Sequence, residues 1–127
     1  MPHSVTQATD DMCDDIVTAM VSRQRDDPTC RWMFGEGDDL EQRMAPWLRV
    51  WIHDLIKLGD VWCVGDGLGI AVWLPPDDLV DLYEIDARAW PIVVAMAEDP
   101  DRYVRFWEWI DNTGMLGGYR LIDLYAP

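Results

Sequence analysis

The chain has 127 residues, of which half are hydrophobic and eight are tryptophan, and its formal net charge is −14. This length predicts one domain over residues 1–127, with ample apolar material for a core. The charge excludes nucleic acid and anionic membranes as expected partners, since both would be repelled, and it favours a cationic partner. No apolar run approaches the ~20 residues that span a bilayer, and the N-terminus lacks a signal-peptide pattern, so we expect a cytoplasmic protein.

The first quarter of the chain predicts a strand followed by a helix. Ser4 to Ala8 alternates weakly between apolar and polar residues, which is typical of a short strand. Apolar residues at helical spacing then predict a helix from Asp10 to Arg25, with Thr9 as its N-cap. Because a proline disfavours helix in the residue before it, Pro28 should separate this helix from a loop at Thr29 to Gly37.

The middle of the chain predicts a helical stretch and a β-hairpin. An apolar stripe begins near Asp38, and Pro46 inside it either kinks the helix or starts a second one. Gly59 is a suitable helix stop. Val61 to Val64 and Ile70 to Leu74 then read as two strands joined by a glycine-rich turn.

The last third predicts helices and a final strand. Leu79 to Asp86 and Pro91 to Glu98 look like two short helical pieces, and Asp99 and Pro100 are suited to begin a longer aromatic helix. Tyr119 to Pro127 reads as a buried strand. The order β–α–α–β–β–α–α–β predicts an α+β (α/β layered) fold, with a mostly antiparallel sheet and helices on its faces.

Residue types that usually carry chemistry give weak signals. Cys13, Cys30 and Cys63 are odd in number and widely spaced, so we expect reduced, buried thiols rather than disulfides or a metal knuckle. The two histidines, His3 and His53, lie far apart, and we expect no metal site. No serine lies in a nucleophile turn.

Four segments together resemble the N-terminal half of the GNAT family of N-acetyltransferases. They are Asp26-Asp27-Pro28 with Arg31-Trp32, the hairpin strand from Gly69 to Pro76 with the sequence GIAVWLPP, the helix end from Tyr103 to Trp107, and Leu121 to Pro127, which is similar to the family's central strand. The hairpin strand is the most specific of the four. The resemblance implies a partial acyl-CoA N-acyltransferase-like fold and an acetyl-CoA-dependent transfer of acetyl to a primary amine, on a small molecule or a peptide.

The resemblance also implies an incomplete active site. In the family, the central strand leads into a glycine-rich Q/R-x-x-G-x-G/A turn and a helix, whose N–H groups bind the coenzyme A pyrophosphate. This sequence ends at Pro127, before such a turn. We therefore expect a truncated or incomplete form.

The resemblance carries over to seven residues. By position, main-chain groups of Leu124, Tyr125 and Ala126 would bind acetyl-CoA, and Asp123 would be the general base for the amine. Asp123 can instead be a local structural acid. Three aromatic residues would line the acceptor pocket, although core packing is the commoner role of such side chains and is favoured for each of them: Trp32, Phe34 and Trp73.

Two other functions stay open at this point. One is a non-catalytic interaction module that pairs through an open sheet edge, including a homodimer through the C-terminal strand. The other is an acidic mimic of nucleic acid that binds a basic protein in a salt-sensitive way.

Overall fold

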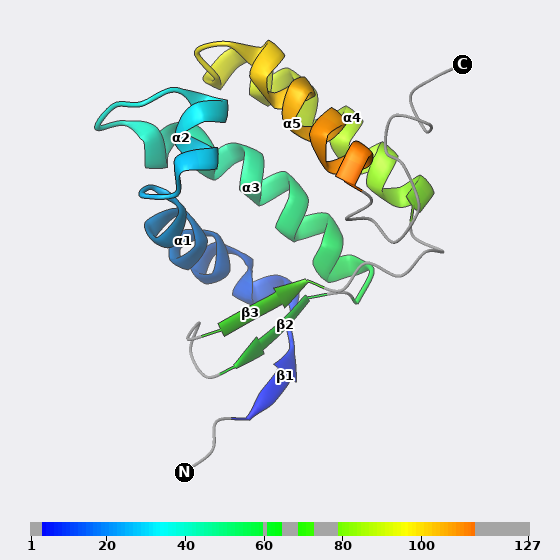
Figure 1. Ribbon diagram of the computed structural model, residues 1–127. Coiled ribbons are helices and arrows are strands. Elements are labelled where there is room, and N and C mark those ends of the chain that lie inside the picture. The colour runs from blue at the N-terminus through cyan, green and yellow to red at the C-terminus, as the bar shows by residue number, and fades with distance from the viewer. Residues whose placement is uncertain (1–3, 60, 65–68, 73–78, 114–127) are drawn as a thin grey trace.

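The computed structural model describes residues 4–59, 61–64, 69–72 and 79–113. Its helices and strands, in chain order, are β1 (Val5–Gln7), the 3₁₀ turn η1 (Asp10–Met12), α1 (Cys13–Gln24), α2 (Pro28–Phe34), α3 (Leu40–Lys57), β2 (Val61–Val64), β3 (Gly69–Val72), α4 (Leu79–Met96) and α5 (Pro100–Thr113). The predicted α+β class is confirmed, but helices make up most of the described chain. In Figure 1 the three strands lie below the helices, at one end of α3.

The described sheet is antiparallel throughout, as the sequence predicts. Its order is β1-β2-β3, with Val5 opposite Val64 and Val61 opposite Val72. Side chains of β2 alternate, so that Val61 and Cys63 are buried while Trp62 is exposed. The predicted hairpin is therefore confirmed for its paired residues, and its turn lies outside the described residues.

Helix α3 is the centre of the molecule. It packs on α1 on one side and on α4 on the other (Figure 1). Its buried side chains recur every three or four residues, which places them on one stripe: Leu40, Met44, Trp47, Leu48, Trp51, Ile52, Leu55 and Ile56. The helix runs without interruption through Pro46, so the alternative of a second helix starting there is wrong. Gly59 follows its end with a φ of 79°, the left-handed conformation that suits a glycine stop.

The predicted loop at Thr29 to Gly37 is wrong, because most of it is helix α2. Pro28 occupies the first turn of α2, where its missing N–H costs nothing, and Asp27 caps the helix by accepting a hydrogen bond from the Thr29 N–H at 3.4 Å. Cys30 and Phe34 lie on the buried face. Burying such apolar side chains stabilises the fold by roughly 1.5–3 kcal/mol each, which outweighs the short length of the helix.

The two short helices predicted at Leu79 to Asp86 and Pro91 to Glu98 are a single helix, α4, with Pro91 inside it. Its buried residues Leu82, Ile85, Ala89 and Val93 keep helical spacing across the proline. Tertiary packing therefore overrides the local preference of proline for a helix start.

Helix α5 begins as predicted. The Asp99 carboxylate accepts a hydrogen bond from the Asp101 N–H at 3.1 Å, and Pro100 takes the first helical position. All three cysteines are free and buried, which confirms that prediction. Burial and a hydrogen bond with Asp27 raise the pKa of Cys30 to about 12, so this thiol is inert at neutral pH. The predicted final strand lies outside the described residues.

Candidate functional site

A pocket of about 390 Å³ opens between α4 and α5, and aromatic rings form most of its wall. Its lining residues are Asp86, Ala87, Trp90, Tyr103, Val104 and Trp107. The Trp90 and Tyr103 rings lie 6.2 Å apart, and the Trp107 ring stands nearly perpendicular to Tyr103 at 6.1 Å. The pocket thus presents ring faces and edges from two helices around one space.

One carboxylate belongs to this aromatic wall. Asp86 is 8% exposed and is the one buried charged residue among the described residues. Its Oδ1 accepts a hydrogen bond from the Tyr103 hydroxyl at 2.6 Å, and that hydroxyl accepts one from the Trp47 indole N–H at 3.2 Å. Burial, and then the negative charge of Asp86, raise the pKa of Tyr103 far above its ordinary value, so Tyr103 stays a hydrogen-bond donor.

Helical spacing brings the four principal groups together. Asp86 and Trp90 are four residues apart on α4, and Tyr103 and Trp107 are four residues apart on α5, so each pair shares one face of its helix. The link between the two helices spans only residues 97–99, and α4 packs on α5. Trp47, on α3, donates its indole N–H to the Tyr103 hydroxyl and so holds that hydroxyl in position.

This arrangement suits a positively charged group on an apolar body. The faces of Trp and Tyr rings attract ammonium cations, and a carboxylate in a poorly polar surrounding adds attraction that water screens little. An anion would meet Asp86 and be repelled. The pocket can therefore select an amine in its protonated form.

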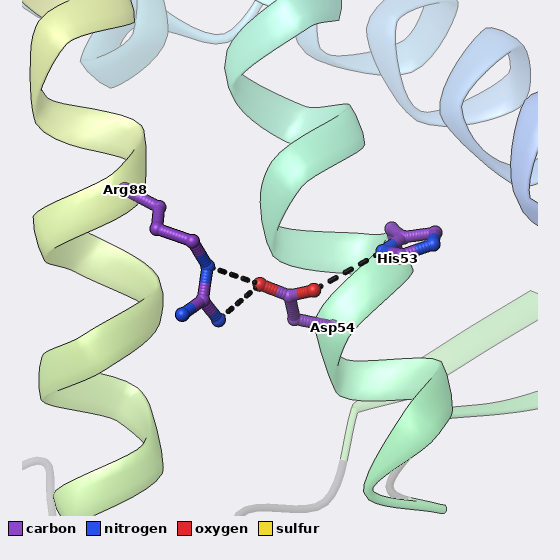
Figure 2. Close-up of polar contacts among 3 residues, drawn as sticks. All are labelled: His53, Asp54 and Arg88. Carbon is purple, nitrogen blue, oxygen red and sulfur yellow. Dashed lines mark hydrogen bonds and ion pairs between the residues drawn. The ribbon is translucent and has the colours of Figure 1, made fainter.

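A second, larger cavity of about 720 Å³ lies between α3 and α4. Figure 2 shows its central polar contacts: Arg88 donates from Nε and Nη2 to Asp54 Oδ2, at 3.0 and 2.5 Å, and His53 Nδ1 lies 3.1 Å from Asp54 Oδ1. Burial of Asp54 favours its neutral form, but the hydrogen bonds and charges of Arg88 and His53 outweigh this effect, and the pKa of Asp54 is lowered.

The structure separates two of the residues predicted to line an acceptor pocket. Trp32 is 41% exposed on α2 and lines a surface hollow beside Arg102, whose guanidinium lies 5.8 Å from its ring. Phe34 is fully buried, and its ring packs 5.1 Å from Trp47. The two side chains therefore do not meet in one cavity among the described residues, and Phe34 has the core position that the sequence allowed as its alternative.

The other predicted site residues lie outside the described residues. They are Trp73, Asp123, Leu124, Tyr125 and Ala126. Their assigned roles as acceptor wall, general base and acetyl-CoA contacts stay predictions.

Sequence reasoning missed the aromatic pocket, although part of its signal is present. The spacing of Tyr103 and Trp107 marks one helix face, but spacing alone does not distinguish a pocket wall from a packing face. The corresponding spacing of Asp86 and Trp90 was hidden, because Pro91 predicts a helix boundary directly after Trp90.

Among the residues that the structure describes, no group of three or more His, Cys, Asp or Glu side chains could hold a metal ion. No helix in the described ranges has both the length and the apolar character needed to cross a membrane.

Comparison with known proteins finds no matching family model, no matching curated protein and no matching solved structure. The resemblance to the GNAT family therefore stays a prediction from the residues quoted for it. A function has to be argued from the geometry of the chain itself.

Proposed function

We propose that this chain binds a cationic amine in the pocket between α4 and α5, as the acceptor-binding part of an acetyl-CoA-dependent N-acetyltransferase. The observation that carries the proposal is the buried Asp86 carboxylate beside three aromatic rings, those of Trp90, Tyr103 and Trp107. The net charge of −14 adds to it, because a negative field raises the local concentration of a cationic ligand.

The pocket also limits the size and character of the amine. Its volume of about 390 Å³ falls in the lower part of the range for small-molecule sites. A cation over an aromatic face gains about 0.5–2 kcal/mol, depending on how far it is desolvated. The apolar wall favours an ammonium group carried on a hydrocarbon or aromatic body, and an arylalkylamine fits this description.

The transfer itself requires a neutral amine nitrogen. After losing one proton to a base, the nitrogen attacks the thioester carbonyl of acetyl-CoA. The C–N bond forms, the C–S bond breaks, and coenzyme A leaves as a thiolate; the nitrogen gives up its second proton to become a neutral amide, and the thiolate takes up one proton. The resemblance assigns the base to Asp123 and the acetyl-CoA contacts to Leu124, Tyr125 and Ala126, and these roles are part of the proposal.

The test is release of coenzyme A thiol from acetyl-CoA in the presence of phenethylamine. We expect amine-dependent release by the wild type, and a Trp90→Ala variant should need about tenfold more amine, because it loses one ring of the pocket. Trp109→Ala is the matched control, since Trp109 lies on α5 but does not line the pocket. Failure of phenethylamine both to bind and to promote release would overturn the proposal.

A second candidate is the non-catalytic interaction module. Within the described sheet, β1 is an outer strand with all three residues exposed, and Val5 is an exposed apolar residue. Such an edge can pair with another strand. Light scattering that gives a defined dimer, together with no acetyl-CoA turnover, would favour this function. A Val5→Lys substitution distinguishes this pairing from the predicted homodimer through residues 119–127. It should weaken a dimer that forms through β1 and leave a dimer that forms through residues 119–127 unchanged.

A further inference from the structure

Basic residues gather in the cavity between α3 and α4, although the chain as a whole is strongly acidic. Three of the ten Lys and Arg residues line it, together with one of the two histidines. They are Arg49, His53, Lys57 and Arg88. The first three are spaced by four residues along α3, which places them on one face over consecutive turns.

The charge of Asp54 is already neutralised inside this cavity. Its side chain is 16% exposed, and its two oxygens are engaged by Arg88 and His53 respectively (Figure 2). The other acid that lines the cavity is Glu84, on α4. Arg49 is paired in turn with Asp14 of α1, so Lys57 is the basic side chain on this face of α3 that has no ion pair among the described residues.

Two donors remain available to a ligand. Arg88 uses Nε and Nη2 for Asp54, and Figure 2 shows its Nη1 directed away from that carboxylate. Lys57 lines the same cavity and has neither an ion pair nor a side-chain hydrogen bond with any described residue. A guanidinium held in place by Asp54 is preorganised, so binding through it loses little side-chain entropy.

The remaining wall of the cavity is apolar. Val50 on α3, Leu58 directly after α3, and Ile85 on α4 contribute to it. Its volume of about 720 Å³ is ample for a small organic molecule. Cationic groups beside an apolar wall match a ligand with an anionic end and a hydrocarbon body.

We propose that the cavity between α3 and α4 binds an organic oxyanion, with Arg88 and Lys57 contacting its charged group and Val50, Leu58 and Ile85 its apolar body. Carboxylates and phosphates share the planar or forked oxygen geometry that Arg recognises. This site is distinct from the amine pocket. Glu84, Ile85 and Arg88 line one side of α4, whereas Asp86, Ala87 and Trp90 line the other cavity.

The test is calorimetric titration of the full chain with three probes of six carbon atoms each: hexanoate, hexyl phosphate and hexanol. We expect hexanoate, hexyl phosphate or both to bind saturably and hexanol to bind at least tenfold more weakly. The stronger of the two anions identifies the oxyanion. Equal binding of hexanol, or no binding of either anion, would overturn the proposal.

Substitutions locate the site. Lys57→Gln should weaken binding of the anion about tenfold, as expected for a lost charged contact of this kind. Arg105→Gln is the control, since Arg105 is an exposed residue of α5 that pairs with Asp101 away from the cavity. Because Lys57 is exposed, Lys57→Gln is expected to stay folded, and a circular-dichroism spectrum checks this. Unchanged affinity in folded Lys57→Gln would contradict the assignment.

Discussion

The Tyr103 hydroxyl joins three helices through two hydrogen bonds, from Trp47 on α3 and to Asp86 on α4. Removing it in Tyr103→Phe deprives the Trp47 N–H of its acceptor and Asp86 of one donor, at a cost of about 1–3 kcal/mol. Urea unfolding measures this loss. Thr18→Val, which removes an exposed hydroxyl from α1, should change the free energy of unfolding by less than about 0.5 kcal/mol. Equal stability of the two variants would refute the role of this hydroxyl.

Asp54 gives the molecule a specific dependence on acid. Because its pKa is lower in the folded than in the unfolded state, its contribution to stability is complete above the unfolded pKa and is lost as the pH falls through the folded pKa. Arg88→Gln should therefore be less stable than wild type at pH 6, by about 1 kcal/mol or less since Arg88 is half-exposed, and the gap should close below about pH 4. Denaturation of both proteins from pH 3 to 6 tests this. Arg105→Gln should show no comparable gap at any pH.

At the scale of elements, α4 is where the structure departs most from the sequence pattern. As a continuous helix it leaves Pro91, which is exposed, without the N–H that would donate to the Ala87 carbonyl. Pro91→Ala should restore that bond and stabilise the fold by about 1–2 kcal/mol, after allowance for the greater freedom of the unfolded chain. Thermal unfolding should show a higher Tm for this variant.

Pro100→Ala is the matched control for this prediction. Pro100 lies at the first position of α5, where no such bond is missing, so its replacement should bring no gain. If Pro91→Ala were neutral or destabilising as well, Pro91 would be acting as a helix start, and the two short helices predicted from the sequence would be the better description.

The elements that could be predicted are those whose signal is local. Asp99 marks the start of α5, and Thr9 marks the 3₁₀ turn η1, although α1 itself begins later than predicted, at Cys13. The antiparallel hairpin follows from two apolar runs around a glycine-rich turn. Two predictions that depended on prolines were wrong: the loop after Pro28 and the helix boundary at Pro91. The local preference of proline is compatible with both a helix break and a helix start, so the sequence alone does not decide between them. The helical conformation at both places is stabilised by burial of side chains, namely Cys30 and Phe34 of α2 and Ala89 and Val93 of α4.

At the scale of the whole molecule, the acidic composition predicts a cationic partner but does not indicate where on the chain it would bind. The pocket between α4 and α5 depends on two relations between residues. Asp86 and Trp90 must lie on one helix, and Trp47 must contact Tyr103, which is 56 residues away in the sequence. The sequence does not predict the first relation, because Pro91 predicts a helix boundary directly after Trp90. It does not predict the second, because that contact forms only when α3 and α5 pack together. The basic cavity was hidden for the same reason, since its residues come from α3 and α4 and only their packing brings them together.

The most direct test of the amine pocket is an NMR titration that follows the indole N–H of Trp107 while phenethylammonium is added, with 2-phenylethanol as the uncharged counterpart. Trp107 lines the pocket, so its signal reports on occupancy. We predict a saturable shift with the ammonium ion, a much weaker response to the alcohol, and loss of the shift in Trp90→Ala but not in Trp109→Ala. Equal shifts with both compounds, or no shift with either, would contradict the binding of a cation at this site.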